Sequence, residues 1–502
     1  MDFLNRPNQY FGRDNVIKKF PNSYSSNGQF LHTGDGSASM RGTGSWQTGW
    51  RYRRTYMILT NRTFLMVSAG ASQNHLKTDT AIHGSVLQFD WPAIQIGIGS
   101  YEEGPTGLTI FRFPGSAVAA VDVRGGSPGT VNTDYLRLGY EQPNVDAVVF
   151  SGGSAYGEET ITAVATGLKD DGIYSGDWDN VALVAGAIIY DFAGRRLNEF
   201  YPDKRLAQAA LHDLRSGVLP VGAQGAGRMA MQGAFFGWGV YSGQGGAFRQ
   251  IDDIKVAAFV VVNSSGAITD RSGRLVKFRN EPTDLPKASD LLANLPASRS
   301  EEWISPPSNR NRNGGRHTTT SLIVTNQKLS YAALQRLAVQ VHTSMARGIQ
   351  PFSTDVDGDT IFALSTEEVS STSLSLRDLS AIAGEVMWDA ILSSVPEDPV
   401  FIPPPPVDLS LANLTRCTGS FRFGPKAVLK IRIHQGQLWA EPTMDFFDFR
   451  SGQSVNLKPI SESDFYVPGI YCTRVSFPRE NPGNIAVINP GRWQQLGFRE
   501  AA

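Results

Sequence analysis

Four consecutive prolines at positions 403–406 divide this 502-residue chain into two parts with different patterns of apolar residues. A proline run holds the backbone extended and offers no amide hydrogen to a helix or to a sheet, so it tends to separate structural units. We therefore expect a linker at residues 397–407, with one domain before it and another at residues 408–502. A chain of this length ordinarily forms about three units.

The segment 84–396 alternates short apolar runs with helical patterns. The residues of 329–347 and of 376–395 have apolar positions at helical spacing. Short runs rich in β-branched residues are typical of buried strands, and they occur at 118–123, 145–150, 181–190, 256–262, 321–325 and 361–366. This mixture predicts a layered α/β or α+β domain of about 310 residues.

Residues 408–502 have the pattern of an all-β domain. Apolar runs at 428–434 and 437–440 flank a Gln-Gly turn, and runs at 474–477 and 485–488 flank an Asn-Pro-Gly-Asn turn. Each pair predicts a β-hairpin. The spacing resembles that of the small β-barrel appended to several bacterial hydrolases, where its role could be stability, assembly or shading of the active site.

Residues 1–83 form a polar extension that we expect to be mostly irregular. Within it, segment 57–71 has the order of a short secretory signal, with Arg62 before an apolar stretch that ends in Ala-Gly-Ala. A translation start at Met40 or Met57 would make the protein secreted or periplasmic, and otherwise we expect it to be cytoplasmic. The alternative is an ordinary buried strand. No apolar run reaches the roughly 18 residues of a membrane-spanning helix.

The charge balance and the scarcity of metal-binding residues exclude several classes of function. With 46 basic and 47 acidic residues the net charge is −1, so we expect no nucleic-acid partner and no membrane partner. Cys417 and Cys472 are the two cysteines, too few for a disulfide-dense fold or a multi-cysteine zinc site, and their pairing stays open. The seven histidines lack metal-ligand spacing, so we expect neither a metal nor a cofactor.

A glycine-rich turn follows the predicted strand 118–123. It reads Arg-Gly-Gly-Ser-Pro-Gly-Thr at 124–130, with Asp134 four residues later. Clustered glycines allow backbone N–H groups to approach an anion or an oxyanion. The turn lacks the lysine of a phosphate-binding loop and the Gly-x-Gly-x-x-Gly of a dinucleotide site. A purely structural turn is the alternative.

A second turn, Ser-Gly-Gly-Ser-Ala-Tyr-Gly at 151–157, joins a predicted strand to a predicted helix. It resembles a nucleophile elbow, but Tyr156 stands where that motif needs glycine. We expect the Tyr156 hydroxyl to donate a hydrogen bond in a pocket whose wall includes Gly152 and Gly153. A packed tyrosine is the alternative.

A third segment, Asp-Val-Asp-Gly-Asp-Thr at 355–360, leads directly into a predicted strand. Its alternate carboxylates suggest calcium, but an EF-hand loop needs glycine and glutamate where this chain has Thr360 and Thr366. What remains is the pair Asp357 and Asp359, able to accept protons or to orient a cationic group.

A fourth segment places small hydroxyl residues where a polar loop meets the predicted strand 321–325. Self-cleavage before such a residue would place a hydroxyl nucleophile and an α-amine base on one residue. An α-amine with a pKa of about 7.7–8.0 can take up a proton near neutral pH without a histidine.

Together, these segments resemble the DmpA-type family of L-aminopeptidase/D-esterases, β-peptidyl aminopeptidases and 6-aminohexanoate-oligomer hydrolases. The resemblance covers about residues 84–395, and it rests on the order of motifs at 122–130, 148–157, 187–191, 318–325 and 357–366. It implies a four-layer αββα sandwich of the N-terminal-nucleophile type, followed here by the small β-barrel. It also implies a homo-oligomer of processed, two-fragment protomers.

The family's functional residues map onto this chain through the matching motifs. The resemblance implies cleavage between His317 and Thr318, Thr318 as the nucleophile, and catalytic roles for Asp357, Asp359 and Tyr156. The implied reaction removes an N-terminal residue from a small peptide, amide or ester through an acyl-enzyme, without a metal. The family commonly has asparagine where this chain has His317. Its oxyanion amide corresponds only loosely to Gln224.

Two other functional classes stay open at this point. Ornithine acetyltransferases resemble this fold and also process before a threonine, so acyl transfer is one alternative. The other is a non-catalytic binding protein that uses the C-terminal domain, perhaps with calcium at residues 355–359.

Overall fold

The computed structural model describes most of the chain from residue 55 onward. The described part is 55–500, with gaps at 61–62, 69–72, 103, 138–142, 174–177, 179, 193–199, 238, 279–283, 296–316, 371–373, 396–397, 400–404, 445–448, 450, 469–472, 479–482 and 489–494. Cys472, Pro403 and Pro404 lie outside it. The division into domains at 83, 396 and 407 stays a prediction.

A ten-stranded sheet forms the framework of the first large part of the chain, in the order β13-β14-β16-β18-β5-β7-β8-β6, with β4 paired to β5 and β9 paired to β4. Its strands are β4 (Gln95–Tyr101), β5 (Thr106–Val123), β6 (Thr130–Val131), β7 (Asn144–Ser151), β8 (Val184–Ile188), β9 (Arg215–Ser216), β13 (Gln244–Ile251), β14 (Ile254–Asn263), β16 (Thr318–Gln327) and β18 (Thr360–Val369).

Helices and smaller strand pairs complete this part. The helices are α1 (Glu159–Asp170), α3 (Lys204–His212), α4 (Ala288–Ala293), α5 (Tyr331–Ser344) and α6 (Leu376–Leu392). The two-stranded pairs are β3 (Val86–Gln88) with β10 (Val218–Pro220), β11 (Met231–Gln232) with β12 (Val240–Tyr241), and β15 (Ala267–Ile268) with β17 (Ile349–Gln350).

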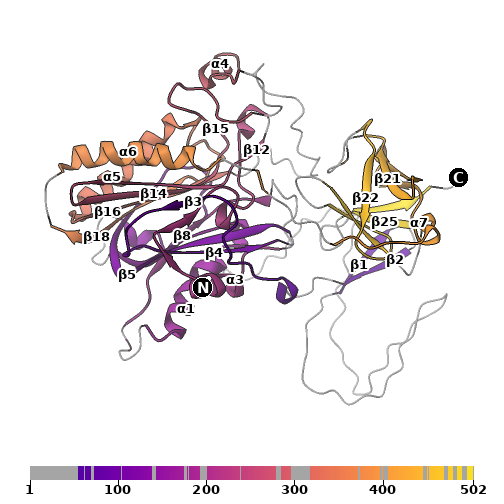
Figure 1. The fold of residues 1–502 in the computed structure, drawn as a ribbon, viewed down its shortest axis with the longest axis horizontal. Helices are drawn as coiled ribbons and strands as arrows, with labels where there is room; N and C mark the ends of the chain where they lie inside the picture. Colours follow the sequence, from indigo (N-terminus) through magenta and orange to yellow (C-terminus); the bar gives the residue numbers. More distant parts are fainter. Residues whose placement is uncertain are drawn as a thin grey trace, which may run out of the picture. The chain divides into compact units, whose positions relative to one another are not determined.

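Three separate apolar cores show that these elements form four layers. One core lies between helices α5 and α6 and strands β14, β16 and β18. A second lies between the two halves of the sheet and contains Phe111, Phe150, Phe259 and Phe362. The third lies between helices α1 and α3 and strands β4, β7 and β8. The two helix pairs cover opposite faces of the sheets (Figure 1), so the predicted αββα sandwich is confirmed.

The alternation of side chains along β16 explains how one strand serves two cores. Ile323 packs toward α5 and α6, whereas its neighbours Leu322 and Val324 pack into the core between the sheets. Successive side chains of a strand point to opposite faces. A strand buried on both faces therefore reads as the continuous apolar run found at 321–325.

The predicted helices at 329–347 and 376–395 are confirmed as α5 and α6. Ser330 caps α5, since its side chain accepts a hydrogen bond from the N–H of Ala333. Ser375 caps α6 in the same way, with the N–H of Asp378 as donor. Both serines satisfy an amide that the first helical turn leaves without a partner.

The C-terminal part is a closed antiparallel barrel of eight strands, which confirms the predicted small β-barrel. The strand β19 closes it by pairing with both β20 and β26. The short helix α7 (Leu411–Arg416) precedes the barrel and was not part of the all-β expectation. The strands are β19 (Gly419–Arg422), β20 (Val428–His434), β21 (Gln437–Pro442), β22 (Val455–Pro459), β23 (Asp464–Val467), β24 (Thr473–Ser476), β25 (Ile485–Ile488) and β26 (Gln495–Arg499).

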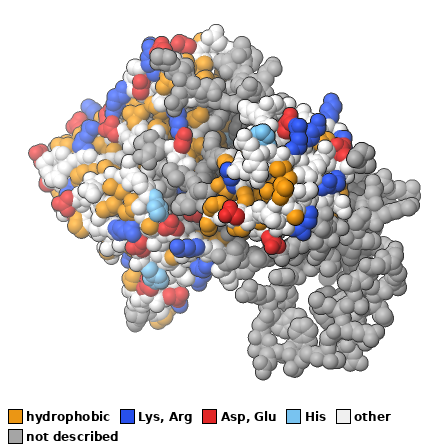
Figure 2. All heavy atoms as spheres, turned by 45° about the vertical axis from the view of Figure 1, so that its right-hand side comes forward, with side chains coloured by type: hydrophobic (Ala, Val, Ile, Leu, Met, Phe, Trp, Pro, Cys, Tyr) orange, Lys and Arg blue, Asp and Glu red, His pale blue; other side chains and the backbone are white. Residues whose placement is uncertain are grey.

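The signal-like segment 57–71 overlaps an antiparallel hairpin of β1 (Thr55–Thr60) and β2 (Thr63–Ser68). Within the described ranges, no helix is both long enough and apolar enough to cross a membrane. Acidic and basic side chains are interspersed on the face drawn in Figure 2, in keeping with the net charge of −1.

Candidate active site

Thr318 is the first residue of β16 and lies between two neighbouring strands of the sheet. On one side β14 pairs with it, with Asn263 opposite Thr318. On the other side β18 runs parallel to β16, with Thr360 opposite Thr320. Thr318 is only 2% exposed. The strand predicted at 321–325 begins three residues earlier, at Thr318, the predicted nucleophile.

The acid pair occupies the turn just before β18, and both carboxylates are buried. Asp357 accepts hydrogen bonds from the N–H of Ser265 at 2.9 Å and from the hydroxyl of Thr354 at 2.5 Å. Asp359 accepts from the N–H of Thr319 at 2.6 Å and from the N–H of Ser353 at 2.9 Å. Asp359 is thus held beside the residue that follows Thr318.

Burial, together with the nearby charge of Asp357, raises the pKa of Asp359 to about 7, against the lowering effect of its N–H donors. Desolvation penalises the charged form of a carboxyl group, and a like charge adds to that penalty. A carboxyl group with a pKa near 7 is divided between its two protonation states at neutral pH. It can therefore take up or deliver a proton there.

Residues 355–359, the turn that carries the acid pair, are called the acid turn below. The backbone of the acid turn binds both the amide and the carbonyl group of His317, next to the bond between His317 and Thr318. The N–H of His317 donates to the carbonyl oxygen of Val356 at 3.1 Å, and the N–H of Gly358 donates to the carbonyl oxygen of His317 at 2.7 Å. The Thr318 hydroxyl lies 2.5 Å from the same carbonyl oxygen. A backbone donor on a carbonyl oxygen is the arrangement that stabilises an oxyanion.

His317 is buried beside the acid pair. Burial lowers the pKa of its imidazole, and the charge of Asp357 opposes that effect. Its Nδ1 atom is buried and has no hydrogen-bond partner among the described residues. The imidazole of His317 is therefore neutral at neutral pH. At the same pH, Asp359 is partly protonated, because its pKa is about 7.

The glycine-rich turn packs directly on the acid turn. The N–H groups of Gly125 and Ser127 donate to the carbonyl oxygens of Asp359 and Asp357, at 3.3 and 2.7 Å. A Cβ atom on Gly125 would lie 2.2 Å from the backbone nitrogen of Asp359, so only glycine fits there. These contacts agree with the structural interpretation of this turn, because its N–H groups bind the protein itself.

Tyr156 ends the 3₁₀ helix η3 (Ser154–Tyr156), which follows β7. Its side chain is 55% exposed. Gly152 and Gly153 are buried in the same turn, where the N–H of Gly153 donates to Asp191 at 3.0 Å. No hydrogen bond within the described part of the chain joins Tyr156 to Thr318 or to the acid pair, so its catalytic role stays a prediction.

Gln224 is buried, with its side-chain amide engaged elsewhere. Its Nε2 donates to the carbonyl oxygens of Val221 at 2.9 Å and Ser85 at 3.3 Å, and its Oε1 accepts from the N–H of His83 at 2.7 Å. Both amide hydrogens are thereby used. The oxyanion role predicted for Gln224 would require one of these bonds to be exchanged.

Three features near Thr318 escaped the sequence analysis: the N–H of Gly358, the N–H of Ser265 and the side chain of Asn263. Asn263 is buried opposite Thr318, with its Nδ2 donating to the carbonyl oxygen of Tyr190 at 3.2 Å. In the sequence, Asn263 stands out only as a polar residue at the end of the apolar run 256–262. The pairing of β14 with β16 was not readable from that signal.

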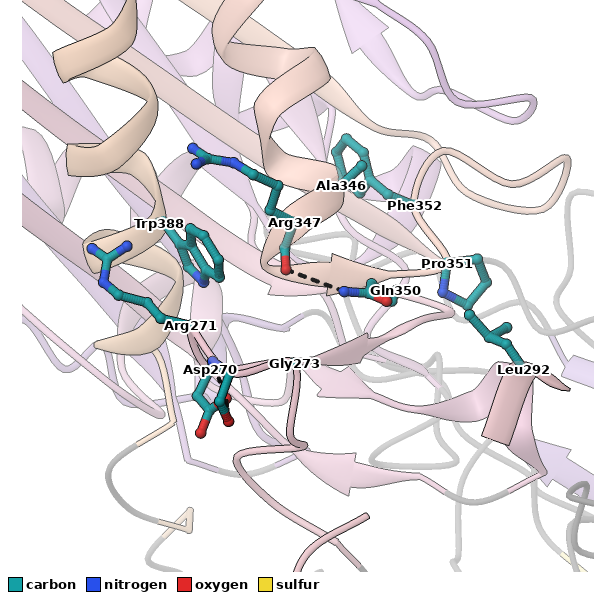
Figure 3. A pocket seen from close by; sticks show the side chains of 11 residues that line it. Asp270, Arg271, Gly273, Leu292, Ala346, Arg347, Gln350, Pro351, Phe352 and Trp388 are labelled. Atoms are coloured by element: carbon teal, nitrogen blue, oxygen red, sulfur yellow. Dashed lines mark hydrogen bonds between the residues drawn. The ribbon is translucent and has the colours of Figure 1, made fainter. Parts of the chain in front are cut away.

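A cavity of about 540 Å³ lies on another part of the sandwich (Figure 3). Trp388 lines it, with Arg271 and Arg347 over its ring. The candidate catalytic residues do not line this cavity. Within the described ranges, no three or more histidine, cysteine, aspartate or glutamate side chains are grouped to hold a metal ion.

Comparison with known proteins shows which family the chain belongs to. Residues 89–397 match the sequence model described as Peptidase family S58. The chain belongs to peptidase family S58. The resemblance inferred from the motifs is thereby confirmed, and as a member of family S58 the protein is a hydrolase related to aminopeptidases and oligomer hydrolases.

Individual known proteins are similar to more than half of the chain. A 6-aminohexanoate-oligomer endohydrolase of Agromyces sp. (strain KY5R) is 39% identical over 324 residues, which are 62% of this chain and 86% of that protein. An uncharacterized aminopeptidase of Mycobacterium leprae (strain TN) is 35% identical over 288 residues, 53% of this chain and 72% of that protein. The solved L-aminopeptidase D-Ala-esterase/amidase of Ochrobactrum anthropi has a TM-score of 0.46 and 16% identity, over 63% of this chain and 88% of that one.

Proposed function

We propose that this protein cuts its own chain between His317 and Thr318 and then acts as an N-terminal-threonine aminopeptidase or amidase. Its substrates would be small peptides, amides or esters, and it would act through an acyl-enzyme on the Thr318 hydroxyl. The observation that carries the proposal is the contact set around one carbonyl group. The His317 carbonyl oxygen accepts the Gly358 N–H, with the Thr318 hydroxyl 2.5 Å away.

Self-processing then follows from the groups around this bond. The Thr318 oxygen attacks the His317 carbonyl carbon, its proton passes to the acid pair, and the N–H of Gly358 stabilises the oxyanion. The Thr318 nitrogen takes up a proton and leaves, so that an ester joins His317 to the Thr318 oxygen. Water hydrolyses the ester to the His317 carboxylate and a free Thr318 α-amine. No external reagent other than water is needed.

Substrate hydrolysis repeats this chemistry with the liberated amine as the base. The Thr318 α-amine takes the proton of its own hydroxyl, as an amine with a pKa of about 7.7–8.0 can near neutral pH. The hydroxyl oxygen then forms the acyl-enzyme, and water completes the turnover. Because Asp359 is bound to the N–H of Thr319, it is held next to the new N-terminus. There it can stabilise the protonated amine.

A denaturing gel tests the proposal. Cleavage would give fragments of 317 and 185 residues, about 34 and 20 kDa when 54.6 kDa is divided in proportion to length. The shorter fragment should begin Thr-Thr-Thr-Ser, and the processed protein should hydrolyse aminoacyl p-nitroanilides. Thr318→Ala should leave one full-length band, whereas Thr318→Ser should still process. Full-length wild-type protein with no hydrolysis would refute the proposal.

A further inference from the structure

Helix α5 carries a completely buried histidine, His342. Its Nδ1 lies 2.9 Å from a carboxylate oxygen of Asp122, which is near the end of β5. Its Nε2 is buried and has no hydrogen-bond partner among the residues that the structure describes. No step of the proposed reaction uses this imidazole, so a buried polar ring at this place calls for another explanation.

The pair formed by His342 and Asp122 is a neutral ring on a charged carboxylate. Burial lowers the pKa of the His342 imidazole, and its hydrogen bond to Asp122 opposes that effect. The imidazole is therefore neutral at neutral pH, and Nδ1 carries its hydrogen, since an ionised carboxylate can only accept. Burial raises the pKa of Asp122, but hydrogen bonds from His342 and Arg124 outweigh burial and hold this pKa below its ordinary value. Asp122 and Arg124 are the charged groups that face His342.

Asp122 connects His342 to the backbone of Asp359. The carboxylate oxygen of Asp122 that accepts from His342 also accepts from Nε of Arg124, at 2.6 Å. The N–H of Arg124 donates to the carbonyl oxygen of Asp359 at 3.1 Å. Three consecutive hydrogen bonds therefore lead from the buried ring to the acid turn.

A second connection leads through Phe352 to the carboxylate of Asp359. The rings of His342 and Phe352 meet edge to face, with centroids 5.4 Å apart. The next residue, Ser353, donates its N–H to the Asp359 carboxylate at 2.9 Å. Ser353 has a φ of 54°, in the left-handed region that a serine rarely adopts. Such a conformation persists where its surroundings hold it, and the contact of Phe352 with His342 is part of those surroundings.

We propose that His342 and Asp122 are positioning residues, which fix where Asp359 lies relative to the scissile bond and which hydrogen bonds its carboxylate accepts. This inference rests on the proposed function, in which the acid pair takes up the proton of the nucleophile. A neutral ring suits the role, because it adds a hydrogen bond without a further charge near Asp359. The charge that faces Asp359 is that of Asp357, which also faces the His317 imidazole.

His342→Phe tests the inference, because it removes the hydrogen bond to Asp122 and keeps a ring beside Phe352. The N–H donors of Asp359 lower its pKa, so a displaced acid turn should raise that pKa by about 0.5 to 1. In the proposed reaction the charged carboxylate takes up the proton. The rate of self-processing should therefore fall about 2- to 5-fold at pH 7 and recover at pH 9.

The measurement transfers full-length protein from a cell-free system to each pH and follows the two fragments on a denaturing gel. Val341→Ala is the matched control. It removes buried volume at the neighbouring position of α5 and leaves the hydrogen bonds of His342 in place. A variant that only loses stability should slow processing alike at pH 7 and pH 9.

Arg124→Ala breaks the same connection from its other end, at a side chain that is 37% exposed, so it tests the inference even if His342→Phe does not fold. Its processing should show the same dependence on pH. The double variant should shift the profile no further than the larger single shift, because both changes break one chain of contacts. Three results would overturn the inference: an unchanged ratio of the two rates in both single variants, an equal change in Val341→Ala, or additive shifts in the double variant.

A further measure needs no processing at all. In a Thr318→Ala background, the part of the Tm profile between pH 4 and 9 that Asp359→Asn removes reports the titration of Asp359. His342→Phe should move the midpoint of that part to higher pH, and an unmoved midpoint contradicts the inference. Wild-type processing and the hydrolysis of aminoacyl p-nitroanilides report on the proposed function by themselves. The two proposals can therefore fail separately.

Discussion

Replacing Gly358 with alanine should slow self-processing by about 100-fold or more. A Cβ atom at this position would lie 2.6 Å from the Thr318 hydroxyl oxygen and 2.7 Å from the carbonyl oxygen of Ser127, whereas ordinary contact begins at 3.4 Å. The hydroxyl or the turn must therefore move by about 0.8 Å. A misplacement of about 1 Å at a reacting group costs on the order of 100-fold in rate.

The assay follows the full-length band after synthesis in a cell-free system, by stopping samples in denaturant and measuring the fraction converted to the two fragments. Gly115→Ala is the matched control, because nothing lies within 4 Å of a Cβ atom there. A thermal melt of the Gly358→Ala protein checks that it is folded. Processing of a folded Gly358→Ala protein as fast as that of Gly115→Ala would refute the placement of Gly358 against the scissile bond.

Three further predictions concern stability. The pKa of Asp359 in the folded protein is raised to about 7. Its contribution to stability is therefore present below its ordinary pKa of 3.8 and is lost as pH rises through 7. In a Thr318→Ala background, Asp359→Asn should lessen the fall of Tm between pH 4 and 8, and an unchanged Tm profile would contradict the raised pKa. Gly125→Ala should lower the free energy of unfolding by about 1–3 kcal/mol, because its Cβ overlaps the acid turn, and urea unfolding beside Gly115→Ala measures it. Phe362→Ala should cost about 3–5 kcal/mol in the same assay, since its ring is fully buried between the sheets, and a loss below 1 kcal/mol would argue against a packed core there.

Local patterns were sufficient to predict the layers and much of the site. The apolar run at 321–325 gave β16, because a strand buried on both faces has no polar alternation. Helical spacing after Ser330 gave α5 together with its cap. Asp357 and Asp359 were predicted from a turn that precedes a strand, and both lie beside Thr318.

The remainder of the site depends on pairing between distant segments. Asn263 faces Thr318 only because β14 pairs with β16, 55 positions further along the chain. The N–H groups of Gly358 and Ser265 carry no sequence signal at all, because every residue except proline has one. For Gln224 the sequence suggested a role that the contacts do not support. Its side-chain amide was predicted to stabilise an oxyanion, but that amide is bound to the backbone of Val221 and Ser85.

The order of strands decides what a break before Thr318 would do to the molecule. Strands β16 and β18 follow the break in sequence, yet in the sheet they are inserted between β14 and β5, which precede it. The strands of the second fragment would therefore be bordered on both sides by strands of the first fragment. Severing the backbone would free the threonine while the body of the protein stays in one piece, and only a denaturant that dismantles the sheet would let the pieces part.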